Sequence, residues 1–347
     1  MKIGIVGFPQ SGRSTIFSAL TGARGAERDH TSKKDLLIAA VTVFDDRIDF
    51  LSQIYQPKKT TYAKIEYLLP PDTGSAGGGG SEGAAWNQIR TCDALLHVIR
   101  NFEGTLGTSP TPEEDFRRLE EEMILNDLVV AEKRMERIEL DKKRGKLPEG
   151  EEASLVQSCL QLLEQGMPLR SDPQLASAPL LKGFTFLSAK PMLILVNNDD
   201  EDESLPAWDQ KPEGVDLFAV RGSLEKEIAS LSAEEAKEFL EAYHIQESAL
   251  DRVIRHSFHI LNRISFFTVG PDEVRAWPIP RGTPALEAAG SVHSDIQQGF
   301  IRAEVVAFDD LKSHGGFNEA KKAGLVRLEG KTYEVKDGDI ITFRFNV

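Results

Sequence analysis

Cysteine is scarce in this sequence, which has only Cys92 and Cys159 among its 347 residues. Two widely separated cysteines provide neither a disulfide framework nor the ligand spacing of a metal site. Long hydrophobic runs are also missing. The longest apolar stretches, Ala94–Ile99 and Met192–Val196, fall far short of the roughly 18 residues that a membrane-spanning helix needs. The N-terminal residues show no signal-peptide pattern, so we expect a cytoplasmic protein that does not enter a membrane.

Positive charge is also in deficit, because 41 Lys and Arg residues face 55 Asp and Glu residues and the net charge is −14. Binding nucleic acid through the whole surface requires a basic protein, so this class of function is excluded. A local basic face is compatible with an acidic chain, and the alternative is an ordinary solvated helix face. The candidate residues are Lys133, Arg134, Arg137, Lys142, Lys143, Arg144 and Lys146.

Short apolar runs typical of buried strands alternate with helical patterns over much of the chain. The runs are Ile3–Val6, Leu36–Val43, Tyr62–Leu69, Ala94–Ile99 and Met192–Val196. Strands that alternate with helices predict an α/β fold with a doubly wound parallel sheet. The glycine-rich segment Pro71–Gly83 has almost no apolar anchor, and we expect it to be a mobile loop.

Two regions depart from this α/β pattern. Between residues 113 and 140, apolar residues recur at spacings of four and three, which predicts an inserted helical hairpin with a coiled-coil seam. Gly145–Gly150 should turn the chain into a return helix. Residues 266–347 contain short apolar runs separated by turns and one expected helix near Phe317–Ala323, which predicts a small α+β module. Its expected strands are Phe266–Val269, Gly299–Val306, Leu325–Leu328, Thr332–Val335 and Ile340–Phe345.

Residues 7–15 have the spacing of a phosphate-binding loop, G-x-x-x-x-G-K-[ST], with arginine in place of the lysine. Backbone N–H groups of such a loop, at the N-terminus of a helix, point at phosphates. Arg13 keeps the positive charge but has a different geometry from lysine, and Ser14 is the predicted magnesium ligand. A glycine turn that merely joins a strand to a helix is the alternative. The predicted phosphate-binding residues are Gly7, Pro9, Gln10, Ser11, Gly12, Arg13, Ser14 and Thr15.

Lys2–Thr21 resembles the opening of the YchF/Obg-like ATPases, a family within the translation-factor-related class of P-loop GTPases. The resemblance continues through Ile89–Phe102, Leu125–Lys133 and Ala189–Asn197, and it is strongest over Ile264–Val347. This last stretch is similar to the family's TGS module, a ubiquitin-like β-grasp fold. The resemblance covers nearly the whole chain in the family's domain order. It implies a P-loop domain over residues 1–110 and 180–265, a helical hairpin over 111–179, and a TGS-like domain over 266–347.

The nucleotide motifs depart from the family's pattern. The family's loop usually reads N-V-G-K-S, whereas Gln10–Ser14 reads Q-S-G-R-S. The region of the family's switch I threonine, near Thr31–Lys33, is rewritten. The family's switch II begins with D-x-x-G at the end of a strand, whereas this strand ends in Leu68–Pro71 and Asp72 lies at the wrong interval from a glycine. Because that aspartate supports magnesium, the resemblance implies a weakened metal site and slow or lost hydrolysis.

Base recognition is partly retained in the sequence. The family's N-x-x-E motif resembles Asn197–Asp200, so the resemblance implies that Asn197 faces the purine edge and that Asp200 takes the place of the glutamate. Aspartate at that position is nearer the guanine-type motif, and the preference for adenine or guanine stays open. A polar strand-end loop is the alternative. Arg221–Ser223 stands where the family has S-A-K and keeps little of it.

Two functions are therefore compatible with the sequence. The first is a monomeric switch that binds ATP or GTP with magnesium, hydrolyses it weakly or not at all, and associates with the ribosome or RNA through its TGS-like domain and basic hairpin face. The second is a nucleotide-independent pseudo-ATPase that acts as an interaction module. The intact glycines and Ser14 favour the first, whereas Arg13 and the missing aspartate favour the second.

Overall fold

The computed structural model of the chain describes residues 1–22, 27–29, 36–71, 81–104, 107–145, 150–209, 212, 214–243 and 248–346. The chain forms two compact units. The first unit comprises Met1–Val41 and Glu66–Val253, and the second unit comprises Thr42–Ile65 and Ile254–Val347. The expected domain ranges need correction here, because they placed residues 42–65 and 254–265 in the P-loop domain, whereas both segments belong to the second unit. Residues 42–65 join the second unit through long-range strand pairing and helix packing, which no local sequence pattern predicts.

The first unit is built on a seven-stranded sheet in the order β2-β3-β5-β1-β6-β7-β8. Strand β1 pairs in parallel with β5 and β6, and β6, β7 and β8 continue the parallel pairing, whereas β2 runs antiparallel to β3 at one edge. The strands are β1 (Lys2–Val6), β2 (Glu27–Asp29), β3 (Leu37–Val43), β5 (Ala63–Leu69), β6 (Ala94–Asn101), β7 (Met192–Asn198) and β8 (Asp216–Val220). The predicted strands at the centre of this sheet are confirmed.

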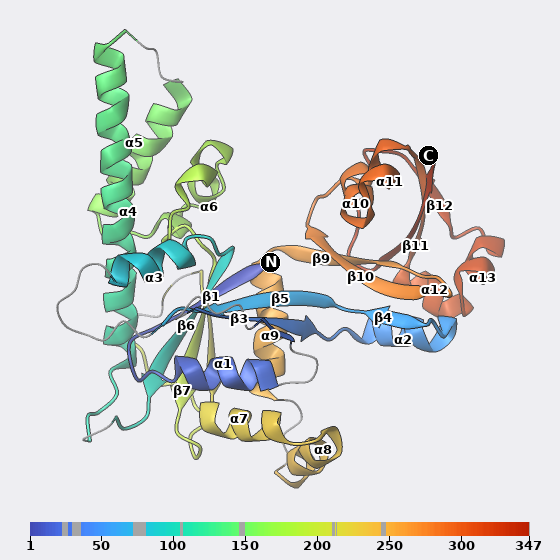
Figure 1. Cartoon of the computed structure of the whole chain (residues 1–347), viewed down its shortest axis with the longest axis horizontal. Coiled ribbons are helices and arrows are strands. Elements are labelled where there is room, and N and C mark those ends of the chain that lie inside the picture. The colour runs from blue at the N-terminus through green and yellow to red at the C-terminus, as the bar shows by residue number, and fades with distance from the viewer. Residues whose placement is uncertain are drawn as a thin grey trace. The chain divides into compact units, whose positions relative to one another are not determined.

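Helices cover both faces of this sheet (Figure 1). Helix α1 packs against α7 on one face, whereas α3 and α4 share a buried cluster with β6 and β7 on the other. The helices are α1 (Arg13–Gly22), α3 (Ser81–Ile89), α4 (Pro112–Lys143), α5 (Gly150–Glu164), α6 (Pro173–Ala176), α7 (Gly222–Ser230), α8 (Ala233–Ala242) and α9 (Ala249–Ile260), with short 3-10 helices at Leu169–Ser171 and Pro179–Phe184.

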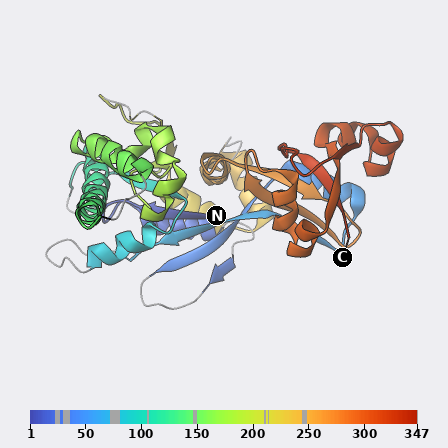
Figure 2. The same cartoon turned by 90° about the horizontal axis from the view of Figure 1, so that it is seen from above.

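Helices α4 and α5 form the predicted hairpin and lie side by side in both views of the chain (Figures 1 and 2). Their seam is a buried cluster to which α4 contributes Ile124, Ala131 and Ile138, and α5 contributes Val156 and Cys159. Apolar residues three and four positions apart lie on one face of a helix, so the sequence spacing specifies this seam.

The second unit contains a six-stranded sheet in the order β12-β11-β13-β9-β10-β4. Successive side chains of a strand point to opposite faces, and Phe266 and Phe267 accordingly enter two separate buried clusters. The strands are β4 (Lys59–Thr61), β9 (Arg263–Thr268), β10 (Glu273–Pro280), β11 (Phe300–Ala307), β12 (Arg327–Glu329) and β13 (Asp339–Phe345). The segment 42–65 belongs here because β4 pairs with β10 and because α2 (Asp46–Tyr55) buries Ile48 and Leu51 in this unit.

Two expectations for residues 266–347 were wrong. One helix was expected, but four occur: α10 (Ala285–Val292), α11 (Ser294–Gln298), α12 (Phe308–His314) and α13 (Phe317–Lys322). These helices are too short for an apolar repeat to be seen, since α12 buries only Leu311 and α13 only Ala320. The expected strand at residues 332–335 is reduced to a single bridge between Pro284 and Glu334. Nowhere in the described part of the chain does a helix combine the length and apolar character needed to cross a membrane.

Candidate functional site

The loop between β1 and α1 has the backbone conformation of a tight glycine cradle. Gly7, Gln10 and Gly12 have φ angles of +147°, +66° and +93°. A Cβ atom at Gly7 would lie 2.3 Å from the carbonyl oxygen of Val98, and one at Gly12 would lie 2.1 Å from Nδ2 of Asn197. Both glycines are therefore required by backbone conformation and by close approach. The spacing in the sequence located this loop correctly.

The open end of this loop leads directly into the first turn of α1, which begins at Arg13. Pro9, Gln10 and Ser14 are exposed, and Arg13 and Thr15 are half-buried. Exposed N–H groups at a helix N-terminus, beside a cationic side chain, form an arrangement that binds anions. The structure thus brings the residues from Gly7 to Thr15 together, and their role in phosphate binding stays a prediction.

Asn197 lies beneath the loop and holds it in place through Ser11, a buried residue of the loop. Asn197 is 4% exposed, and its Nδ2 donates to the carbonyl oxygen of Ser11 at 3.0 Å. Its Oδ1 accepts from the backbone N–H of Gly222 at 2.9 Å, at the start of α7. The amide therefore braces the loop against a distant helix, which the sequence motif did not reveal. Base reading by Asn197 stays a prediction.

Asp200 lies just beyond β7 on the same side of the sheet. Its Oδ1 accepts from the backbone N–H of Leu224 in the first turn of α7 at 3.2 Å. Arg221, which immediately precedes α7, forms an ion pair with Glu203 at 2.8 Å. The residues expected to recognise a base thus surround the N-terminus of α7, and the side chains of Asn197 and Asp200 both bind backbone N–H groups there.

A cavity of about 250 Å³ lies beside the loop. Phe8 and Arg13 line it from the loop, and Pro70 and Pro71 line it from the end of β5. The guanidinium carbon of Arg118 in α4 lies 4.9 Å from the centre of the Phe8 ring. Arg118 could not be predicted from the sequence, because it is one of many charged residues on a long helix. Two prolines therefore occupy the strand end where the family's switch aspartate was expected.

Among the described residues, few protein ligands for a metal lie at this site. Ser14 offers an exposed hydroxyl at the first turn of α1. Over the described residues, no group of three or more His, Cys, Asp or Glu side chains is arranged to hold a metal ion. Thr31–Lys33 and residues 72–80, which make up most of the segment that was expected to be a mobile loop, lie outside the described residues. The expected loop extended too far, because Ser81–Gly83 form the start of α3.

His97 lies in β6 next to β1 and is buried in the first unit, with 1% of its surface exposed. Neither ring nitrogen bonds to a described residue, and the ring stacks on Phe116 with centroids 6.0 Å apart. Burial, together with the positive charges of Arg170 and Arg13, lowers the pKa of His97 to about 3. The imidazole is therefore neutral and belongs to the core.

We expect His97→Leu to reduce the loss of the free energy of unfolding that occurs as the pH falls from about 6.5 to about 3. Unfolded histidine takes up a proton near pH 6.5, whereas folded His97 does not until about pH 3. The unfolded state thus binds more protons between these values, and stability falls as the pH falls, by about 1.4 kcal/mol per unit. Urea unfolding at several pH values measures the slope, and the exposed His314 provides a control in His314→Leu. Equal slopes in the unmodified protein and His97→Leu would contradict this origin.

Comparison with known proteins identifies relatives along the whole chain. It is 37% identical over 365 residues to the ribosome-binding ATPase YchF of Bacillus subtilis (strain 168), with 100% of both chains covered. It is 35% identical to the ribosome-binding ATPase YchF of Escherichia coli O157:H7, covering 100% of this chain and 99% of the relative. The Obg-like ATPase 1 of Oryza sativa subsp. japonica is 36% identical, with 100% of this chain and 92% of the relative covered.

The structural comparison agrees. The YchF GTPase of Schizosaccharomyces pombe superposes with a TM-score of 0.85 at 27% identity, covering 99% of this chain and 97% of that chain. The family model YchF-GTPase_C, described as "Protein of unknown function (DUF933)", matches residues 263–346. These similarities confirm the predicted fold class. The chain belongs to the YchF/Obg-like ATPase family.

Proposed function

We propose that this protein binds a purine nucleotide, ATP or GTP, at the loop of residues 7–15, with hydrolysis slow or absent. The observation that carries the proposal is the glycine cradle, which Asn197 braces from below and which leads to the first turn of α1, where Ser14 is exposed. The names of the relatives, ribosome-binding ATPase YchF and Obg-like ATPase, support it.

Each part of the loop has a role in this proposal. Backbone N–H groups of Gly12, Arg13 and Ser14 face the phosphates, and the guanidinium of Arg13 neutralises their charge. Pro9 has no N–H group, and the N–H of Ser11 donates to the carbonyl oxygen of Phe8 at 3.2 Å. Magnesium, when bound, supplies further charge neutralisation, and the hydroxyl of Ser14 is its protein ligand, since hard cations prefer oxygen. Asn197 and Asp200 lie on the side where the base is placed.

Slow hydrolysis follows from the groups around the loop. Phosphoryl transfer depends on positioned charge, and here Pro70 and Pro71 line the cavity at the strand end where a carboxylate would support magnesium. Arg13 has a planar fork in place of the compact ammonium of lysine. Loss of one preorganised electrostatic group commonly costs about 10²–10³ in rate, so turnover should fall far below that of a relative with complete motifs.

The proposed switch associates with a ribosome or RNA in a manner that depends on the bound nucleotide. On the hairpin, Lys133, Arg137 and Lys142 are exposed, but Arg134 pairs with Glu152 at 2.7 Å. In the TGS-like region of the second unit, Lys321 and Arg344 both pair with Glu304. The exposed hairpin residues are therefore the stronger candidates for such contacts.

The competing proposal is a pseudo-ATPase that needs no nucleotide for its interactions. Phe8, Pro70, Pro71 and Trp86 in the lining of the cavity favour it, because apolar side chains offer little to a phosphate or its metal, whereas Arg13 and Arg118 in the same lining favour the first proposal. A protein that binds neither ATP nor GTP, with or without magnesium, would support this alternative and contradict the first proposal.

Arg13→Lys is expected to improve nucleotide affinity by a larger factor than turnover, because the support for magnesium stays incomplete. Titration with ATP and GTP, with and without magnesium, measures affinity, and steady-state phosphate release measures turnover. Ser14→Ala should remove the magnesium dependence of binding. Ser18→Ala, in the same helix but beyond the loop, is the matched control. Robust multiple turnover by the unmodified protein, abolished by Ser14→Ala, would show that hydrolysis is intact.

A further inference from the structure

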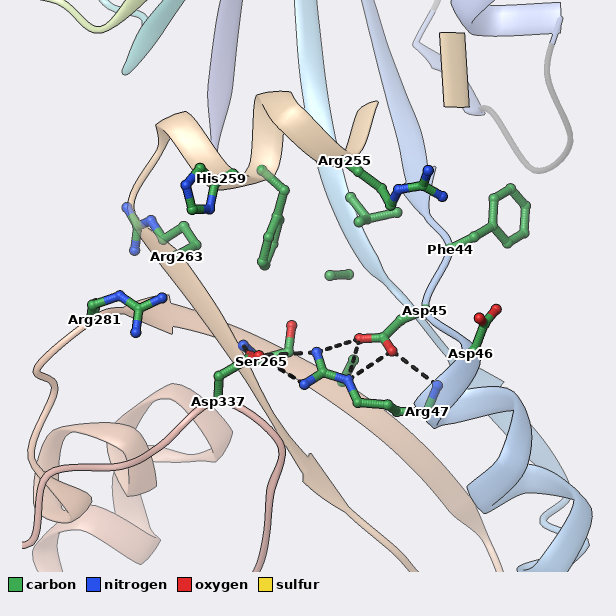
Figure 3. A pocket seen from close by; sticks show the side chains of 14 residues that line it. Phe44, Asp45, Asp46, Arg47, Arg255, His259, Arg263, Ser265, Arg281 and Asp337 are labelled. Atoms are coloured by element: carbon green, nitrogen blue, oxygen red, sulfur yellow. Dashed lines mark hydrogen bonds and ion pairs between the residues drawn. The ribbon is translucent and has the colours of Figure 1, made fainter. Parts of the chain in front are cut away.

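A second pocket lies entirely within the second unit and shares no residue with the phosphate-binding loop. Its volume is about 410 Å³, which is the size of many small-molecule sites. Residues from the end of α9, the start of β9, the end of β10 and the segment that leads into α2 line it (Figure 3). Four arginines and one histidine face three aspartates in this lining, although the chain carries a net charge of −14.

Two of the three aspartates of the lining are already partnered, and the third, Asp46, lies at the start of α2 away from His259 and Arg263 (Figure 3). Arg47 donates from Nη2 to Asp45 at 2.7 Å and from Nη1 to Asp337 at 2.8 Å (Figure 3). Burial lowers the pKa of Arg47, but these hydrogen bonds outweigh it and raise the pKa above its ordinary value. Asp337 also accepts from the backbone N–H of Ser265 at 2.9 Å. Asp45, Arg47 and Asp337 therefore form an ion-pair network in which each charged group has a partner.

Three basic side chains on the other side have no such partners. The side chains of His259, Arg263 and Arg281 form no hydrogen bond or ion pair with a described residue, although they line one side of the pocket together (Figure 3). Nε of Arg263 is buried and has no acceptor among the residues that the structure describes. A buried donor without an acceptor and clustered like charges are both unfavourable, and an anion between them would relieve both.

The backbone fixes these three residues around one turn. The N–H of Asn262 donates to the carbonyl oxygen of His259 at 2.9 Å, and the N–H of Arg281 donates to that of Asn262 at 3.0 Å. Arg263 begins β9 and pairs with Pro280. Both arginines thus come from the end of one strand pair, and such preorganised guanidinium groups suit the planar, bidentate recognition of phosphate oxygens.

The remaining lining is apolar. Phe44, which is 43% exposed, and Phe258 line the pocket together with Ala63 and Ala276. Phe44 lies on the side away from His259 and Arg263 (Figure 3). A ligand that extends from the arginines to Phe44 would therefore combine a charged end with a flat or apolar portion.

We propose that this pocket binds a small organic phosphate, with Arg263, Arg281 and His259 at the phosphate and Phe44 at the organic portion. The site is separate from the phosphate-binding loop, and the proposal does not depend on nucleotide binding there.

Titration of the full chain, labelled with nitrogen-15 arginine, with pyrophosphate and with adenosine monophosphate tests the proposal. The Nε–H resonance of Arg263, assigned by its loss in Arg263→Lys, reports on this pocket alone. It should shift and saturate with both probes. Arg281→Gln should weaken the binding of both probes by about tenfold or more, as expected for a lost charge-assisted hydrogen bond. Phe44→Ser should weaken adenosine monophosphate binding but not pyrophosphate binding.

Arg302→Gln is the matched control, because Arg302 is an exposed arginine of the same unit that does not line the pocket. It should leave the titrations unchanged, and Arg281→Gln should leave ATP and GTP binding at the loop unchanged. No shift of the Arg263 resonance at millimolar probe would overturn the proposal. A decaribonucleotide without terminal phosphate that shifts this resonance at lower concentration than adenosine monophosphate would also overturn it, in favour of an RNA-binding surface.

Discussion

Asn197→Asp is expected to weaken ATP or GTP binding by about 100-fold, because it replaces the donor of one hydrogen bond under the loop by an acceptor. Nδ2 of Asn197 donates to the carbonyl oxygen of Ser11 at 3.0 Å, and a carboxylate oxygen placed there would face another oxygen. The site is buried, so water cannot screen the repulsion, and the loop has to move away. Isothermal titration with each nucleotide measures the effect.

The neighbouring Asn198→Asp provides the control. Asn198 is also buried, and its Nδ2 donates to the carbonyl oxygens of Asp202 at 3.0 Å and Ser204 at 2.6 Å. The same substitution therefore places the same charge one residue further along β7, where it contacts the following loop and not the cradle. We expect both variants to lose stability, but only Asn197→Asp to lose binding. Binding within about threefold of the unmodified protein would show that Asn197 does not hold the cradle.

The central strands of the first unit could be predicted because strands covered on both faces are nearly continuous apolar runs. Ala94–Ile99 and Met192–Val196 were recognised in this way and form the cores of β6 and β7. The hairpin was recognised because its apolar spacing is local. By contrast, Lys59–Thr61 pairs with Glu273–Arg275, and no pattern within either segment specifies a partner more than 200 residues away.

The candidate site was predicted to a similar extent. The glycine spacing located the cradle, because a backbone that must adopt positive φ leaves glycine at fixed positions. The brace from Asn197 to Ser11 was missed, since it joins residues 186 positions apart through one side-chain amide. Phe8 and Arg118 were missed as well, because their contact depends on how α4 packs against the sheet. The basic pocket of the second unit combines segments 43–47 and 255–281, which no linear motif connects.

Asp127 attaches the base of the hairpin to the turn after α3 and to the segment that precedes β7. Its side chain is fully buried and accepts four hydrogen bonds. Arg90 donates at 2.9 Å, the N–H groups of Leu187 and Ser188 donate at 3.0 and 2.7 Å, and the hydroxyl of Ser188 donates at 2.8 Å. Arg90 has further acceptors only in the carbonyl oxygens of Asn126 and Thr185 among the described residues. Removal of the carboxylate thus leaves the guanidinium of Arg90 without its counter-ion and the two N–H groups of Leu187 and Ser188 without their acceptor.

Asp127→Ala is therefore expected to lower the free energy of unfolding of the first unit by about 3–5 kcal/mol, the cost of breaking a buried ion pair on one side. Asp127→Asn should cost less, because it keeps the shape and one acceptor oxygen. Urea unfolding in a Trp277→Phe background measures the effect, since the remaining Trp86 and Trp208 both lie in the first unit. Glu152→Ala is the control, because Glu152 pairs with the part-exposed Arg134 of the same hairpin and should cost at most about 1 kcal/mol. A loss for Asp127→Ala as small as that of Glu152→Ala would mean that Asp127 is dispensable at the hairpin base.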